Sequence, residues 1–67
     1  MTTEMLKPAA KRVPFRPFRV RLPNAEMAIP TEENIHVHPD GKTVFIFDPA
    51  GGYNVVDISL ITDLRFD

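Results

Sequence analysis

The sequence predicts an all-β protein, built as a small five-stranded barrel or a strongly bent antiparallel sheet with single helical turns. Short runs of β-branched and aromatic residues recur along the 67-residue chain. Proline, glycine, asparagine and aspartate separate these runs every few residues, which is typical of small barrels and sandwiches. The most apolar stretch, residues 42–58, has the pattern of a complete β-hairpin.

The first arm of this hairpin places four β-formers in a row. Side chains alternate across a strand, so Val44 and Ile46 share one face while Phe45 and Phe47 share the other. Both faces are apolar, and each needs cover from this chain or from a neighbouring copy. The turn that follows is DPAGG, in which proline fixes one φ and glycine accepts positive φ without steric cost. The second arm is predicted over residues 53–56.

The N-terminal residues 1–13 show no sustained periodicity and are predicted to be a flexible basic arm on a small β domain at 14–67. A helical turn can start over Met5 and Leu6, but Pro8 is expected to end it early.

The β domain begins with a clean alternation. Phe18, Val20 and Leu22 alternate with Arg19 and Arg21, which predicts a half-buried strand. The prolines before it belong at the start of the strand or on an edge. Further predicted elements are a strand at 26–29, a helical turn capped by Thr31, a strand at 35–38, a turn at 58–61 and a last strand at 62–66.

Strands of this number and length, closed by a single turn and a final edge strand, are typical of SH3-like and Sm-like barrels. Such a likeness of fold carries no function with it.

Size and composition favour association. A chain of 67 residues forms one small domain, which buries only about 60% of its unfolded surface. Cysteine is absent, so neither a disulfide nor a thiolate metal site can stabilise the domain, and oligomerisation is the expected additional source of stability.

No apolar run reaches the roughly 20 residues of a membrane span, and the first residues lack the apolar core of a signal peptide. We therefore expect a cytoplasmic protein that does not bind membranes.

Charge is distributed unevenly along the chain. Residues 1–22 hold six lysines and arginines and one glutamate, whereas residues 23–67 hold two basic and eight acidic residues. This asymmetry predicts a basic segment attached to an acidic body. An array of cations can neutralise phosphates, and nearby aromatic rings such as Phe15 or Tyr53 can stack on bases. The candidate nucleic-acid contacts are Lys7, Lys11, Arg12, Arg16, Arg19 and Arg21.

Against this alternative stands the acidic balance of the rest of the chain, since a dedicated nucleic-acid binder usually has a basic overall balance. If the chain does not bind nucleic acid, the arginines form a solvated face, or pair with acidic residues of the same or a neighbouring subunit.

Two histidines are the weak candidates for a metal site. His36 and His38 have the spacing that puts both on one side of a strand, and Asp40 is a third candidate ligand. Structural zinc normally takes four protein ligands, so a solvated strand face is the favoured interpretation and no cofactor is expected.

The chain has no nucleophile-elbow, cysteine-nucleophile or phosphate-loop motif, and we expect no enzymatic activity.

The strand with two apolar faces favours a self-associating or adaptor module. If its aromatic side is not covered within the chain, it forms an exposed patch of the kind that marks protein contacts. A symmetric homodimer is the commonest solution for such a patch, and a separate protein partner is the other. The predicted interface consists of Val44, Phe45, Phe47, Tyr53 and Val55.

Three segments carry a resemblance to a known group of proteins. PFRPFRVRLPN, IHVHPDGKTVFIFDP and GGYNVVDISLIT resemble short bacterial proteins of a planctomycete type, which have a PFxPFxVxL start, a HPDGxTVxxFDP hairpin and an apolar ending. The resemblance covers roughly residues 14–64. It implies the same domain boundaries and assigns no activity.

Overall fold

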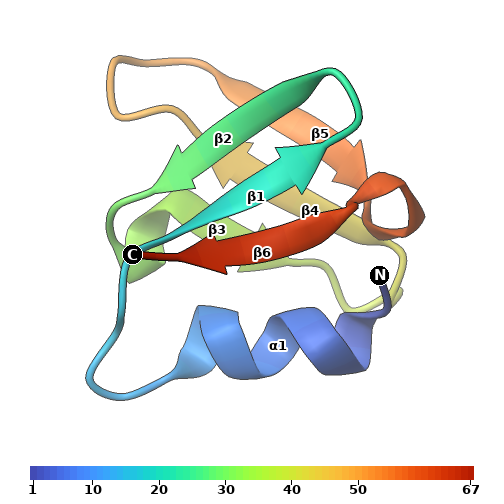
Figure 1. The fold of residues 1–67 in the computed structure, drawn as a ribbon, viewed down its shortest axis with the longest axis horizontal. Coiled ribbons are helices and arrows are strands. Elements are labelled where there is room, and N and C mark those ends of the chain that lie inside the picture. The colour runs from blue at the N-terminus through green and yellow to red at the C-terminus, as the bar shows by residue number, and fades with distance from the viewer.

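Six short strands form two three-stranded antiparallel sheets in the computed structural model, which describes all residues 1–67 (Figure 1). The elements in chain order are α1 (Thr3–Lys11), β1 (Phe18–Leu22), β2 (Ala25–Ile29), the 3-10 turn η1 (Glu32–Asn34), β3 (Ile35–Val37), β4 (Thr43–Phe47), β5 (Tyr53–Asp57), the 3-10 turn η2 (Ile58–Leu60) and β6 (Asp63–Phe66). The protein is therefore mostly β, with one helix.

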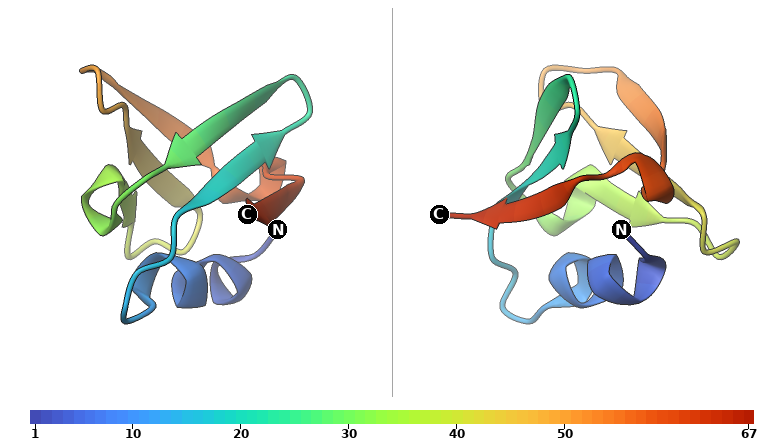
Figure 2. Two further views of the ribbon diagram at one scale, coloured as in Figure 1. Left: turned by 60° about the vertical axis from the view of Figure 1, so that its left-hand side comes forward. Right: turned by 45° about the vertical axis from the view of Figure 1, so that its right-hand side comes forward.

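The strand order is β2-β1-β6 in one sheet and β3-β4-β5 in the other. No ladder of hydrogen bonds joins the two sheets, so the strands do not close into a barrel, and there are six of them rather than the expected five. Pro30 and η1 lie between β2 and β3 and separate the two strands. Figure 2 shows β2 and β5 at one end of the two-sheet stack and α1 at the opposite end.

The predicted hairpin is confirmed as β4 and β5. Their antiparallel register sets Val44 opposite Val56, and Phe47 opposite Tyr53. In the connecting turn, the Asp48 carbonyl accepts a hydrogen bond from the Gly51 N–H at 2.9 Å, and the Asp48 N–H donates to the Gly52 carbonyl at 3.0 Å. Gly51 and Gly52 have φ of +111° and +79°, a region that side chains other than glycine rarely adopt.

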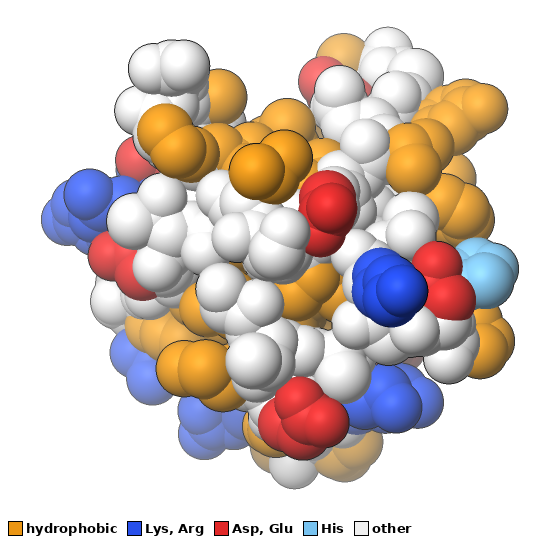
Figure 3. All heavy atoms as spheres, turned by 90° about the vertical axis from the view of Figure 1, so that its right-hand side faces the viewer, with side chains coloured by type: hydrophobic (Ala, Val, Ile, Leu, Met, Phe, Trp, Pro, Cys, Tyr) orange, Lys and Arg blue, Asp and Glu red, His pale blue; other side chains and the backbone are white.

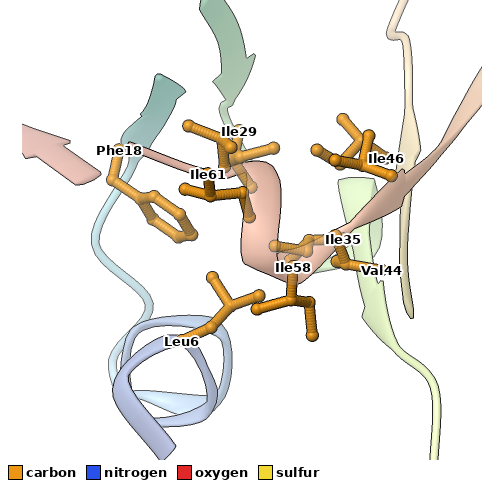
Figure 4. Packing of buried hydrophobic residues seen from close by; sticks show 10 residues of the cluster. Leu6, Phe18, Ile29, Ile35, Val44, Ile46, Ile58 and Ile61 are labelled. Carbon is orange, nitrogen blue, oxygen red and sulfur yellow. The ribbon is translucent and has the colours of Figure 1, made fainter. Parts of the chain in front are cut away.

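The core consists of ten buried apolar side chains that come from both sheets, η2 and α1 (Figure 4). They are Leu6, Phe18, Val20, Ile29, Ile35, Val44, Ile46, Val56, Ile58 and Ile61. The β1 alternation is confirmed, because Phe18 and Val20 are buried while Arg19 and Arg21 are exposed. The prediction that Thr31 precedes a helical turn is also confirmed, since it is the N-cap residue of η1.

The N-terminal segment differs from the predicted arm. Residues 3–11 form helix α1, and the expectation that Pro8 ends the helix is wrong, because Pro8 lies inside it. Leu6 is wholly buried, and burying a leucine is worth about 1.5–3 kcal/mol. A proline within a helix costs about 3 kcal/mol. The two effects are of similar size, so docking of Leu6 against the sheets explains why this short helix persists.

The structure contains no helix with the length and hydropathy needed to cross a membrane.

Candidate interaction surface

The outward side of sheet β3-β4-β5 carries a row of aromatic and aliphatic side chains, here called the aromatic face. Its members are His36, Phe45, Phe47, Tyr53 and Val55. The strand register brings them together, because Phe45 lies between His36 on β3 and Val55 on β5, and Phe47 lies opposite Tyr53. Their inward neighbours Ile35, Val44, Ile46 and Val56 occupy the core.

The rings of the aromatic face are in contact with one another. The ring of His36 stacks on that of Phe45 with centroids 6.0 Å apart, and the rings of Phe47 and Tyr53 lie 5.9 Å apart. His38 approaches Phe45 edge-on, also at 6.0 Å. These separations lie in the range that aromatic contacts prefer, so the rings of the face pack in pairs rather than as independent side chains.

Solvent reaches most of this surface. Phe47 is 38% exposed, Tyr53 67% and Val55 60%, while Phe45 is half-buried between its neighbours. Figure 3 shows hydrophobic side chains along the margin of the molecule that carries a histidine, with basic and acidic side chains directly beside that histidine as well as on the opposite margin. An exposed group of apolar side chains of this kind is typical of protein contact sites.

Val44 was predicted as an interface residue, but it lies outside the aromatic face. It is wholly buried in the core of its own chain because strand alternation turns it away from Phe45 and Phe47. His36, by contrast, was not predicted as an interface residue. The signal for it lies in the sequence, since His36 alternates with the buried Ile35 and the half-buried Val37 and must therefore share the outer face of the strand.

Three of the predicted nucleic-acid contacts, Arg16, Arg19 and Arg21, form a group here called the arginine face. Arg19 and Arg21 lie on β1 in sheet β2-β1-β6 and are exposed, and both are paired with carboxylates of the same chain. Arg19 binds the Glu26 carboxylate at 2.9 Å, and Arg21 binds Asp63 at 3.2 Å. The Arg16 guanidinium lies 5.4 Å from the centre of the Phe66 ring.

Arg16 also donates a hydrogen bond to the backbone carbonyl of Asp67 at 2.8 Å. Each arginine of this face therefore already has a partner within the chain.

The other three predicted cations belong to the N-terminal segment. Lys7 and Lys11 are exposed on α1 one turn apart, and Arg12 follows the helix. None of them takes part in the ion pairs of the chain. The six candidate phosphate contacts thus divide into an α1 group without acidic partners and a β1 group with partners.

His38 and Asp40 are used within the turn before β4, whereas His36 stacks on Phe45. His38 Nδ1 accepts a hydrogen bond from the Asp40 N–H at 3.1 Å. The Asp40 carboxylate accepts from the N–H groups of Lys42 and Thr43 and from the Thr43 hydroxyl at 2.8–3.0 Å. No group of three or more histidine, cysteine or carboxylate side chains is arranged to hold a metal ion.

These hydrogen bonds set the ionisation of Asp40. The backbone N–H of Lys42 contributes most to lowering the pKa of Asp40 from 3.8 to about 2, with smaller contributions from the Thr43 hydroxyl and N–H. The pKa of Asp57 is also lowered, chiefly because its carboxylate accepts from the hydroxyl and then from the N–H of Ser59. Both carboxylates stabilise turns at the ends of the β4-β5 hairpin.

A hollow of about 200 Å³ lies between β2 and the β4-β5 hairpin. It is lined by Glu26, Met27, Ala28, Ile46, Asp48, Pro49 and Asn54. Ile46 and Asn54 are cross-strand partners, and strand alternation puts them on the side of the sheet opposite Phe45. The hollow and the aromatic face are therefore different surfaces.

Comparison of the chain with protein-family models, curated proteins and solved structures gives no match. Function is therefore inferred from the residues and geometry of this chain alone.

Proposed function

We propose that the protein is a non-enzymatic module that associates with copies of itself through the aromatic face. The observation that carries the proposal is the exposure of Phe47, Tyr53 and Val55 as neighbours on one sheet surface. Burying such side chains contributes about 25 cal/mol per Å² of apolar surface removed from water. A 67-residue chain with ten buried residues gains additional stability from this contact.

The charge layout is compatible with this role. The aromatic face holds no lysine, arginine or carboxylate, so two copies can approach without like-charge repulsion. The charged face of the other sheet is already neutralised by its own ion pairs.

The test is a matched pair of charge substitutions. Val55→Asp on the aromatic face and Leu60→Asp on η2 change side chains that are 60% and 59% exposed. Light scattering after size exclusion is expected to give a dimer for the wild type and Leu60→Asp, and a monomer for Val55→Asp. A monomeric wild type at every concentration tested would refute self-association, and an unchanged mass for Val55→Asp would exclude this face.

The proposal extends to the type of barrel, the cellular location and the relatives of the chain. We propose that the two sheets form an opened SH3-like or Sm-like barrel in which β2 and β3 are the halves of one bent strand, supported by the strand order on either side of η1. The proposed setting is the bacterial cytoplasm. The proposed relatives are the short planctomycete-type proteins, through the PFRPFRVRL and HPDGKTVFIFDP segments.

A second candidate function is nucleic-acid binding, favoured by the α1 group of cations without acidic partners. In this alternative, Lys7, Lys11 and Arg12 bind phosphates, and affinity falls as salt rises. Replacing all three by glutamine should reduce the slope of log K against log salt, by about 0.7–0.9 for each phosphate that is no longer neutralised. Arg19→Gln with Arg21→Gln is the control, and a slope that changes equally in both variants would contradict the assignment to α1.

A further inference from the structure

We infer that the self-association occurs by strand addition, with the edge strand β5 pairing antiparallel with β5 of a second copy to form a continuous six-stranded sheet. This inference rests on the proposed function and specifies which strands of the two copies pair. An exposed strand edge offers a row of free N–H and C=O groups that a second strand can pair with.

β5 is the least protected of the four sheet edges. Natural proteins guard edges with charged residues, prolines, short strands or a covering helix. β2 carries Glu26, and β6 carries Asp63 and Arg65. β3 has three residues, and α1 packs against it (Figure 1).

β5, by contrast, contains no lysine, arginine or proline, and its outward side chains Tyr53 and Val55 are exposed. Its one charged residue, Asp57, lies at the end of the strand and already accepts two hydrogen bonds from Ser59.

The hydrogen bonds of the hairpin show which backbone groups of β5 are free. The Asp48 N–H bonds to Gly52 and the Ile58 N–H bonds to Lys42, at opposite ends of one unbroken register. Bonded and non-bonded pairs alternate in an antiparallel ladder, so Asn54 and Val56 bond to β4. The N–H and C=O groups of Tyr53 and Val55 therefore point away from β4, into the open edge.

These free groups favour one register between the two copies. With Tyr53 opposite Val55 of the second copy, all free groups of both residues pair, and the two-fold axis passes between the two Asn54 residues. The outer face then gains two aromatic–β-branched pairs, which are among the favourable cross-strand contacts. Asn54 is exposed on the other side, where its amide can donate to and accept from the amide of its own copy.

A second copy fits this edge because the contact is self-complementary. Two-fold pairing places the same surface, uncharged from Tyr53 to Val56, on both sides and satisfies the closed symmetry of most homo-oligomers. A standard interface buries about 800 Å² per partner, whereas the whole chain exposes 4510 Å². A five-residue edge with Tyr53 and Val55 supplies only part of such an area, so the dimer is expected to dissociate on dilution.

A cysteine pair tests the register directly, because the chain has no cysteine of its own. In the proposed dimer, Asn54→Cys faces its own copy in a non-bonded pair with Cα atoms about 4.5 Å apart, within the range of a disulfide. Mild oxidation should therefore convert most of Asn54→Cys to a covalent dimer. Val55→Cys is the control, since its copy lies two residues away along the strand, beyond the about 7 Å that a disulfide spans.

Val55→Pro tests the backbone contact. Proline removes an N–H that only the second copy uses, and an edge strand tolerates it. Light scattering should show loss of the dimer, with the circular-dichroism spectrum retained. A dimeric Val55→Pro, or cross-linking of Val55→Cys in place of Asn54→Cys, would overturn the inference.

The two proposals fail in different ways. If the wild type dimerises, Val55→Asp is monomeric, and yet Asn54→Cys does not cross-link, the aromatic face associates by packing face to face and strand addition is wrong. If the wild type is monomeric at every concentration, self-association itself is wrong.

Discussion

Arg21 on β1 and Asp63 on β6 lie directly opposite each other in the β1-β6 ladder and form an ion pair of 3.2 Å. Their side chains are 44% and 51% exposed, so water and salt screen the attraction. Exposed pairs of this kind contribute about 0.2–1 kcal/mol. The pair therefore orders the arginine face without contributing much to folding.

A double-mutant cycle measures this contribution. Urea unfolding of Arg21→Ala, Asp63→Ala and the double variant should give a coupling energy below about 1 kcal/mol that decreases in high salt. A coupling above about 2 kcal/mol that is independent of salt would contradict the solvent-exposed geometry.

Leu6→Ala should be the most damaging single change in the N-terminal segment. Leu6 is wholly buried, and truncation of a buried leucine costs about 2–5 kcal/mol. Met5→Ala is the matched control, because Met5 is the preceding residue of the same helix and is 61% exposed. Chemical denaturation should separate the two variants clearly. Equal stabilities would mean that α1 is not docked on the sheets.

The stability of the fold should fall in acid because of Asp40. Its pKa is lowered from 3.8 to about 2 in the folded chain by the hydrogen bond from the Lys42 N–H and further bonds from Thr43. A lowered pKa stabilises the fold above pH 3.8, and this stabilisation is lost as the pH falls toward about 2. Asp40→Asn should therefore be less stable than the wild type at neutral pH and equal to it near pH 2. Thermal unfolding across this range checks the difference, and a constant gap between the two proteins would disprove the linkage.

Replacing Gly52 should lower the stability of the fold because of the backbone conformation at this position rather than because of steric contacts. Its φ is +79°, and beyond Gly52 itself and its two chain neighbours no heavy atom lies within 4 Å of an added Cβ. Gly52→Ala is expected to cost about 1–2 kcal/mol through the left-handed conformation alone. Gly52→Asn should cost less, since asparagine adopts this conformation more readily. Thermal melts of the two variants test the order, and a smaller loss for alanine would refute the strain explanation.

The strands were predictable because their pattern is local. The alternation in FRVRL and the DPAGG turn specify β1 and the β4-β5 hairpin from neighbouring residues alone. Helix α1 was not predictable in this way. Its single buried residue, Leu6, is stabilised by contacts with residues far along the chain, such as Ile58 and Phe18 (Figure 4). A nine-residue segment with an internal proline has little helical tendency of its own.

The residues of the aromatic face were predicted in part for the same reason. Phe45 and Phe47 follow from strand alternation, and Tyr53 and Val55 follow from the hairpin register. Assigning Val44 to an interface overlooked that the chain itself covers the inner side of the sheet. The alternation of His36 with the buried Ile35 puts it on the outer side of β3, but its place beside Phe45 depends on the pairing of β3 with β4.

Helix α1 gives the molecule a route of partial opening that its sheets do not share. Isolated helices of this length are marginal in water, and Pro8 leaves the Glu4 carbonyl without its helical hydrogen-bond donor. The amides of α1 should therefore exchange with solvent through detachment of the helix alone, while those of β4 exchange only when the whole chain unfolds. Detachment of α1 would expose the end of the core that contains Leu6 and leave the aromatic face intact, so opening of the helix would not disturb the surface proposed for association.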